Sequence, residues 1–329
     1  KWAHVLKSHA LQVPRFRNTC RRMNWPGLLA WSTKYHDGTA PSQFKPLSDE
    51  DRAFLEKAME EAFGKMEDPN KIMREAIEQI NSKDRTDESI ATALEVLDKC
   101  CDDVDCARNV EKLNGLQPLI DLLQTHSGPI RVRALEILAL LLSNNPDIQQ
   151  AGVRRGAMKV FVRLVGECPR GSDERAKAFR ALVALVRQVA VFEETLLRGA
   201  GGMAIILSFL EPEEDARSRE KAASFVRSLA TDGRFQADEA AALIKAVAPL
   251  LRGIVDEGMQ YREVVTECTF ELLRTFPGKC TPETQDAIRE RLAKVQAEKD
   301  PEAETELAGL MQCMAALGDG GMATAPPAA

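Results

Sequence analysis

One position recurs along this chain at an almost constant interval. Ala93, Ala134, Ala178, Ala222 and Thr266 are separated by 41, 44, 44 and 44 residues, and a basic pattern precedes the three central members. An interval of this length holds two or three helices with their turns, and one such unit cannot bury its apolar face alone. The units must therefore stack, and the sequence predicts a helical solenoid.

The helices and turns inside each interval agree with this interpretation. Apolar runs over residues 134–142, 178–186 and 222–229 predict helices that are buried on nearly all sides. Gly115, Gly156 and Gly201 lie 22 or 23 residues after a repeat position, where a sharp turn between helices is expected. The period is close to that of armadillo and HEAT units, so we predict an all-α fold, an armadillo-like right-handed helical solenoid.

Composition limits the classes of partner. The chain has 329 residues, 44% hydrophobic and 29% charged, with a net charge of -6. It can bury a large core, and its acidity disfavours general binding to nucleic acid or to a membrane surface. No run of 18 apolar residues occurs. We expect a monomer that binds neither nucleic acid nor a membrane.

Charge and composition divide the chain into segments. The first 22 residues carry six basic residues and no acidic one, which is typical of a transit peptide. Met23 is an equally good start, so the stretch could also be an upstream extension. We predict a basic extension (1–22), a flexible Trp/Leu segment (23–47), N-terminal helices (48–85), armadillo-like repeats (86–276), C-terminal helices (277–317) and a disordered tail (318–329).

A search for catalytic chemistry finds no recognised motif. The four histidines, His4, His9, His36 and His126, have no metal-ligand spacing and no neighbouring nucleophile in a known arrangement. Residues 199–202 are rich in glycine, but they occupy the repeat turn and no strand precedes them. The eight cysteines are scattered, and we expect reduced thiols that pack in the core, as in the cytosol. We predict no enzyme activity, no catalytic residue, no metal and no cofactor.

The repeated basic residues are the candidate binding site. Equivalent positions in stacked units form a row, so the cations at the starts of successive helices predict a ladder of positive charge along a groove. The alternative is that these cations pair with local acids. The ends of the same helices add two asparagines and two arginines to the groove. The candidate residues are Arg131, Arg133, Asn144, Asn145, Arg175, Lys177, Arg187, Lys221 and Arg227, and Arg219 belongs to the same ladder.

Three stretches of sequence resemble a known family. They are residues 24–32 with 37–39, residues 142–149 around Asn144, Asn145 and Gln149, and residues 175–187 from Arg175 to Arg187. Together they resemble the armadillo-type nucleotide exchange factors of heat-shock protein 70 chaperones, the Fes and Hsp-binding-protein group. The resemblance covers residues 24 to about 235.

This resemblance implies a co-chaperone without enzymatic activity. Its repeats would grip one lobe of the nucleotide-binding domain of a cytosolic heat-shock protein 70, weaken ADP binding and so promote release of the chaperone's substrate. Trp25, Leu28, Leu29 and Trp31 would occupy the chaperone's substrate site. We expect a cytoplasmic protein, with import directed by residues 1–22 left open. The alternative is an armadillo adaptor for an extended peptide, but such grooves usually rely on a recurrent array of Trp and Asn, and the repeats here contain no Trp.

Overall fold

The computed structural model describes residues 48–50, 52–55, 57, 68–101, 104–199, 201–253, 258–298 and 303–318. The chain divides into two compact units, residues 1–66 and 67–329. In the first unit the described residues include helical positions at 49–50, 52–55 and 57. The predicted Trp/Leu segment, the basic extension and residues 319–329 of the predicted C-terminal tail lie outside the described residues, while Gly318 is the last residue of the final helix.

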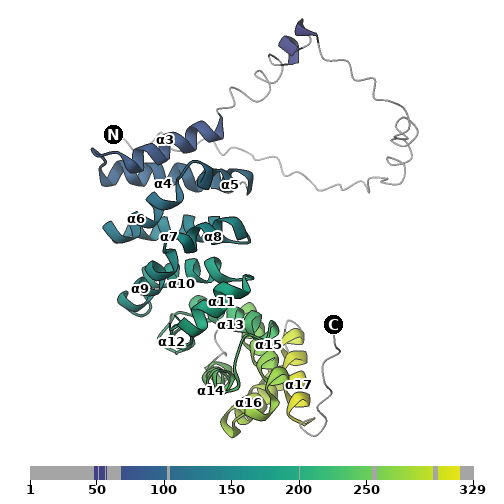
Figure 1. Cartoon of the computed structure of the whole chain (residues 1–329). Helices are drawn as coiled ribbons and strands as arrows, with labels where there is room; N and C mark the ends of the chain where they lie inside the picture. The colour runs from purple at the N-terminus through teal and green to yellow at the C-terminus, as the bar shows by residue number, and fades with distance from the viewer. Residues whose placement is uncertain are drawn as a thin grey trace, which may run out of the picture. The chain divides into compact units, whose positions relative to one another are not determined.

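The described residues of the second unit form helices and no strands, so the predicted all-α solenoid is confirmed (Figure 1). The helices are α3 (Pro69–Asn81), α4 (Asp87–Cys101), α5 (Val104–Lys112), α6 (Leu116–Thr125), α7 (Pro129–Leu142), α8 (Pro146–Arg154), α9 (Ala157–Glu167), α10 (Asp173–Val186), α11 (Ala190–Gly199), α12 (Gly202–Phe209), α13 (Ala216–Thr231), α14 (Ala237–Gly253), α15 (Met259–Thr275), the short η2 (Pro277–Lys279), α16 (Pro282–Glu298) and α17 (Glu304–Gly318).

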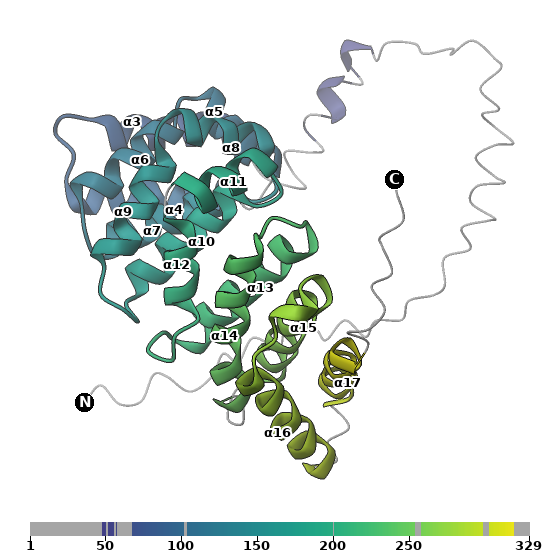
Figure 2. The same cartoon turned by 60° about the horizontal axis from the view of Figure 1, so that its bottom comes forward.

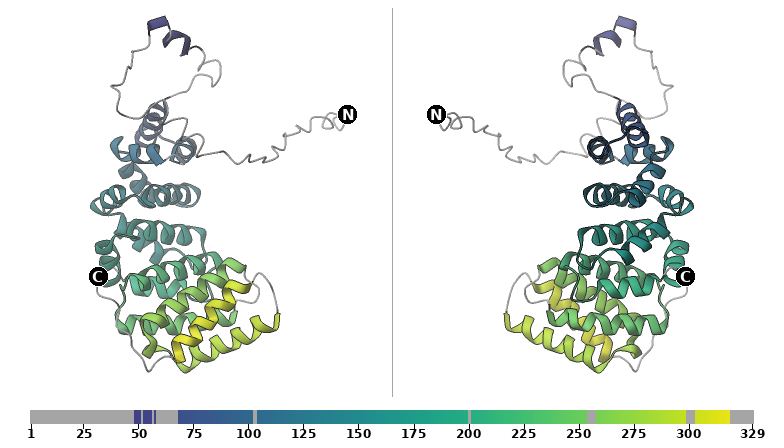
Figure 3. Two further views of the ribbon diagram at one scale, coloured as in Figure 1. Left: turned by 90° about the vertical axis from the view of Figure 1, so that its right-hand side faces the viewer. Right: turned by 90° about the vertical axis from the view of Figure 1, so that its left-hand side faces the viewer.

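Successive units place equivalent helices side by side, which the labelled views of Figures 1 and 2 and the colours of Figure 3 show as layers that follow one another from α3 to α17. One row consists of α4, α7, α10, α13, α15 and α17, and we call it the inner row. A second row consists of α6, α9, α12, α14 and α16. The runs predicted to be buried helices lie within α7, α10 and α13 of the inner row. Packing along this row is close at α7–α10, α13–α15 and α15–α17 and is sparser at α10–α13.

Local sequence explains where the central inner helices begin and end. The Ser172 hydroxyl accepts a hydrogen bond from the Arg175 N–H at 3.4 Å at the start of α10, and Asp173 and Glu174 complement the positive end of the helix dipole. The helix ends at Arg187, after which Gln188 takes a left-handed φ of 66°. Asp215 begins α13 in the same way and accepts from the Ser218 N–H at 2.9 Å.

The repeat glycines lie at the predicted turns between helices. Gly156 and Gly201 have φ of 78° and 69°, a left-handed conformation that side chains disfavour, and they begin α9 and α12. Gly115 is required for a different reason, since its φ is -78° and a Cβ there would lie 2.6 Å from Ile77 Cδ1. Both kinds of turn bring consecutive helices into the close packing that a solenoid needs.

The described cysteines are free thiols, and Cys101, Cys168, Cys268 and Cys313 are buried. Burial raises the pKa of Cys268 and of Cys313 to about 12. These thiols are therefore protonated at neutral pH and act as small apolar core residues. Among the described residues, no helix is long and apolar enough to cross a membrane.

Candidate functional site

Cations of the inner row pair with acids that lie about one repeat away. Arg131 contacts Glu174 at 3.0 Å, Lys177 pairs with Glu136, and Arg227 pairs with Glu267. Each pair joins two neighbouring helices of the row, so it adds to the contact between units. Much of the predicted positive ladder therefore links one repeat to the next. The alternative interpretation also expects pairing with acids, but with acids close by in the sequence and not in a neighbouring repeat.

Arg175 departs furthest from the prediction, because it is buried and does not line a groove. Its side chain is 7% exposed and its Nε donates to Glu214 at 2.8 Å. Nη2 donates to the Ser208 hydroxyl at 2.8 Å, Nη1 donates to the Val165 carbonyl, and the guanidinium stacks 4.6 Å from the centre of the Phe209 ring. These contacts engage all three nitrogens of the guanidinium within the protein.

A pocket of about 420 Å³ lies between the C-terminal half of α10 and the first half of α13, next to the end of α7. Its cations are Arg180, Arg187 and Lys221, and none of them has an ion-pair partner within the described parts of the chain. The remaining lining is neutral and consists of Ser143, Asn144, Val183, Ala184, Gln188 and Ser224. The pocket is therefore positively charged and contains no carboxylate.

A second pocket, of about 360 Å³, continues along the same two helices toward their starts. It shares Arg180 and Lys221 with the first and adds Arg217 and Lys177. Its two carboxylates are already engaged: Asp215 caps α13, and Asp173 lies 4.0 Å from the Lys177 Nζ. We call the surface formed by both pockets the α10–α13 seam.

The end of α10 is held in place by a neighbouring unit. Gln149, 2% exposed, donates its Nε2 to the carbonyls of Ala184 at 2.8 Å and of Arg187 at 3.0 Å. These carbonyls have no partner inside the helix, so the glutamine satisfies the final turn. The backbone of Arg187 is thereby fixed at the point where its side chain enters the pocket.

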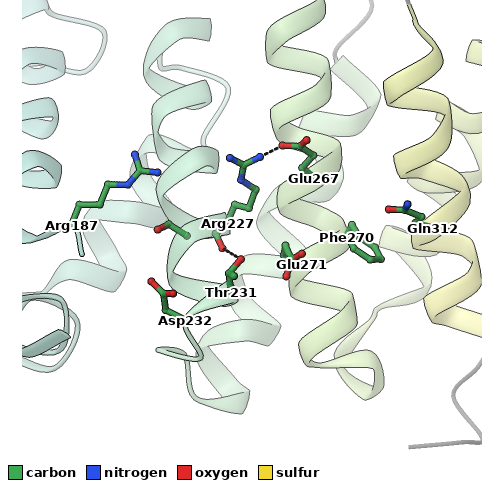
Figure 4. A pocket seen from close by; sticks show the side chains of 9 residues that line it. Arg187, Arg227, Thr231, Asp232, Glu267, Phe270, Glu271 and Gln312 are labelled. Atoms are coloured by element: carbon green, nitrogen blue, oxygen red, sulfur yellow. Dashed lines mark hydrogen bonds and ion pairs between the residues drawn. The ribbon is translucent and has the colours of Figure 1, made fainter. Parts of the chain in front are cut away.

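A third pocket, of about 520 Å³, begins on the other side of Arg187 and extends across α13 and α15 to Gln312 of α17. Figure 4 shows Arg187 on one side and the Arg227–Glu267 pair facing it across the pocket, with Phe270 beyond. Asp232 and Glu271 also line it, so its charge is mixed. Arg187 thus borders two adjacent pockets of the inner row.

The other predicted residues take several positions. Arg133 contacts Asp98 at 3.3 Å and Glu136 at 3.4 Å, and it lines a further hollow beside α7. Asn144 is exposed, with a left-handed φ of 54°, while Asn145 is the N-cap residue of α8. Arg219 contacts the Tyr261 hydroxyl at 3.0 Å. The tryptophans and leucines of residues 25–31 lie outside the described residues.

Two of the seam's cations, Arg180 and Arg217, were not among the predicted site residues. A signal for both was present, because Arg180 lies seven residues before Arg187 and Arg217 lies four before Lys221. Residues at such spacings share a helix face. The prediction instead relies on the basic residues that recur at the helix starts, and several of these form ion pairs between one unit and the next.

The chemistry that this site offers is binding through charge and hydrogen bonds. Across the described residues, no group of three or more His, Cys, Asp or Glu side chains is placed to hold a metal ion. The pockets offer guanidinium and ammonium groups, hydroxyls and amides, which suit carboxylates or other anions on a partner.

One ion pair of the ladder gives a pH-dependent prediction. Burial alone would raise the pKa of Glu174, but the hydrogen bond from the Gly128 N–H and the charge of Arg131 outweigh it, so the pKa is lowered. A lowered pKa stabilises the fold above the unfolded value near 4.3, and this contribution is lost as the pH falls through the folded value. We expect Glu174→Gln to lower the Tm at pH 7, by a difference that shrinks toward pH 3.

Thermal melts of both proteins between pH 7 and pH 3 measure this difference. Glu194→Gln, at an exposed position of α11, is the matched control and should follow the wild type at every pH. A Tm difference for Glu174→Gln that stays constant over the whole range would contradict the assignment.

Comparison with known proteins gives a consistent result. Residues 26–110 match the family model described as nucleotide exchange factor Fes1. The Hsp70 nucleotide exchange factor FES1 of Eremothecium gossypii is 26% identical over 189 residues, covering 54% of this chain and 64% of that protein. The nucleotide exchange factor SIL1 of Rattus norvegicus is 25% identical over 227 residues, covering 69% of this chain and 46% of that protein.

Solved structures support the fold. A designed armadillo repeat protein superimposes with a TM-score of 0.57 at 17% identity, covering 74% of this chain and 99% of the other. A computationally designed armadillo repeat protein for modular peptide recognition gives 0.56 at 18% identity, with the same coverage. At these identities the likeness concerns the fold alone.

The matches to curated relatives extend over less than two thirds of the length of each of those proteins, from 37% to 64%. They nevertheless agree with one another in family, and the armadillo-type fold agrees with them. In the matched part of its sequence the chain is similar to the Hsp70 nucleotide exchange factors, and in fold it is similar to armadillo repeat proteins.

Proposed function

We propose that this chain is a co-chaperone that promotes ADP release from a heat-shock protein 70 and thereby release of the chaperone's substrate. The observation that carries the proposal is the match of residues 26–110 to the Fes1 family model, together with relatives that are named as exchange factors. The partner would be the nucleotide-binding domain of a cytosolic heat-shock protein 70.

The inner row supports this function with a rigid surface that carries three adjacent pockets. A stack of helices holds its side chains at fixed spacings, so the row can bind an extended area of a folded partner. The unpaired cations Arg180, Arg187 and Lys221 lie at the middle of this surface. We propose that they form the centre of the interface.

Exchange needs no catalytic group, because it follows from thermodynamic linkage. If the protein prefers the nucleotide-free chaperone, it must lower the chaperone's affinity for ADP by the same factor by which ADP lowers its own. The proposal is therefore a binding protein and not an enzyme. Occupation of the chaperone's substrate site by Trp25, Leu28, Leu29 and Trp31 remains a prediction.

The direct test is release of a fluorescent ADP analogue from a cytosolic heat-shock protein 70, followed by stopped flow with and without this protein. We expect faster release, and a dissociation constant for ADP about 5- to 150-fold higher, as coupling of 1–3 kcal/mol would produce. Titrating the protein onto ADP-loaded and nucleotide-free chaperone should give the same factor.

Two variants make the test specific to the site. Arg180→Ala with Arg187→Ala should reduce the acceleration, whereas Lys159→Ala, at an exposed position of α9 outside the three pockets, should not. Binding with an unchanged rate of ADP release would identify the chain as an armadillo adaptor instead. Absence of binding by the folded protein would end the proposal.

A further inference from the structure

The α10–α13 seam differs in charge from the neighbouring seams of the inner row. Lys177–Glu136 and Arg131–Glu174 join α7 to α10, and Arg227–Glu267 joins α13 to α15. In each case opposite charges face one another across the boundary between two units. Attraction of this kind supports close packing of the two helices.

Across the α10–α13 seam, cations face cations instead. Arg180 and Arg187 come from α10 and its end, Arg217 and Lys221 come from α13, and none of the four has an ion-pair partner within the residues that the structure describes. The contact that links this side of α10 to the next unit is made at the helix start, where Arg175 binds Glu214. Packing between these two helices is also sparser than elsewhere in the row.

Like charges at facing positions are unfavourable because they repel one another. The two carboxylates of the seam, Asp173 and Asp215, contact Lys177 and the start of α13 and form no ion pair with these four cations. The chain as a whole is acidic, with a net charge of -6, so the cations are not a consequence of its composition. The three adjoining pockets also leave space between the helices for another group. An arrangement that lowers stability and leaves space is typical of a binding site.

We propose that the α10–α13 seam receives the carboxylates of an acidic segment on the protein partner, which replace the acids that the other seams supply internally. The proposal rests on the proposed function for the identity of the partner. The argument from the unpaired cations of the seam is independent of that function. Arg180 and Arg187 would hold the carboxylates from one side and Lys221 from the other. The hydroxyl of Ser224 and the amide of Asn144 would complete their hydrogen bonds.

Geometry explains why the ligand should be a segment with more than one carboxylate. The pocket of about 420 Å³, which contains no carboxylate, shares Arg180 and Lys221 with the pocket of about 360 Å³. The positive surface therefore extends along the helices. The pocket also lies near the ends of α7 and α10, whose partial negative charge opposes a single compact anion. Several carboxylates spread along the seam meet the cations and lie farther from these helix ends.

Lys221→Glu tests the two parts of the inference separately. In the isolated protein it places an acid in the pocket that Arg180 and Arg187 line, so it should raise the Tm by about 1–3 °C. With the chaperone it should weaken binding about tenfold or more and remove most of the salt dependence of the association rate. Lys159→Glu on α9 makes the same change of charge and should alter neither quantity.

A double-mutant cycle separates the seam from effects within α13, where the new glutamate could also contact Arg217. The rise in Tm should shrink when Lys221→Glu is made in an Arg180→Gln background, because the partner across the seam has been removed. Lys221→Gln serves as a milder variant, and it should weaken chaperone binding without lowering the Tm.

The outcomes distinguish this inference from the proposed function. A lower Tm for both Lys221→Glu and Lys221→Gln, with Lys159→Glu unaffected, would overturn the claim of repulsion. Chaperone binding and ADP release that are the same in Lys221→Glu as in the wild type would overturn the docking surface and leave the exchange function intact. If the wild type binds no chaperone, both the partner and the function fall together.

Discussion

Arg175→Ala is expected to lower the free energy of unfolding by about 3–5 kcal/mol, because it breaks a buried ion pair and leaves the other charge in place. Glu214 is 1% exposed at its side chain and loses the guanidinium at 2.8 Å. The Phe209 ring loses the cation stacked on it, and the Ser208 hydroxyl loses a donor. Urea unfolding followed by circular dichroism measures the loss.

Arg180→Ala is the matched control, since it removes the same side chain five residues later on the same helix. Arg180 is exposed and has no ion-pair partner in the described parts of the chain, so its loss should change stability by less than about 0.5 kcal/mol. For chaperone binding the order should be reversed. At a temperature at which both variants are folded, Arg180→Ala should bind the chaperone more weakly than Arg175→Ala does. Equal destabilisation by both would contradict the structural role given to Arg175.

A second variant tests whether the stability lost in Arg175→Ala is due to Glu214, which is left buried without its ion-pair partner. Arg175→Met with Glu214→Leu removes both charges and keeps apolar volume, and such replacements of buried pairs are often close to neutral. We expect the double variant to recover most of the stability that Arg175→Ala loses. A double variant as unstable as the single one would mean that the packing on Phe209, rather than the ion pair, is what matters.

Arg175 and Lys177 show how far sequence alone could predict the site. Both belong to the same recurring pattern, and the prediction treated them alike. Their environments differ because Glu214 lies 39 residues further on, in the loop before α13, and reaches the first but not the second. A repeat pattern predicts that positions are equivalent within the stack, but not which neighbour supplies a partner.

The C-terminal part of the solenoid shows a related limit. Thr266 was predicted to continue the register, and it is buried in α15, the next helix of the inner row. The two short helices α11 and α12 are replaced there by one helix, α14, which spans 17 residues and carries Pro249 inside it. The repeat interval is therefore kept, while the number of helices per unit changes. Because the sequence pattern does not show this change, it predicts α16 and α17 as helices but does not assign them to the two rows.

Glu306→Ala is expected to lower the free energy of unfolding by about 3–5 kcal/mol, as much as Arg175→Ala does, but only for the last helices of the solenoid. Glu306 is completely buried and accepts from Arg291 Nε at 2.6 Å and from Arg262 Nε at 2.8 Å. It comes from α17, while its partners come from α16 and α15, so one carboxylate joins three helices. Without it, two guanidinium groups of like charge face one another in the core.

The stability of a solenoid is a sum of the stabilities of its units and of the contacts between neighbouring units. The loss of stability in Glu306→Ala should therefore be limited to the units that contact Glu306. Hydrogen exchange should show lost protection in α15–α17 and native protection in α7 and α10. Glu304→Ala, at an exposed position two residues earlier, should leave the whole pattern unchanged. Because the α10–α13 seam lies in earlier units, ADP release should persist in Glu306→Ala under mild conditions. Uniform loss of protection along the chain would instead mean that the solenoid unfolds as one cooperative body.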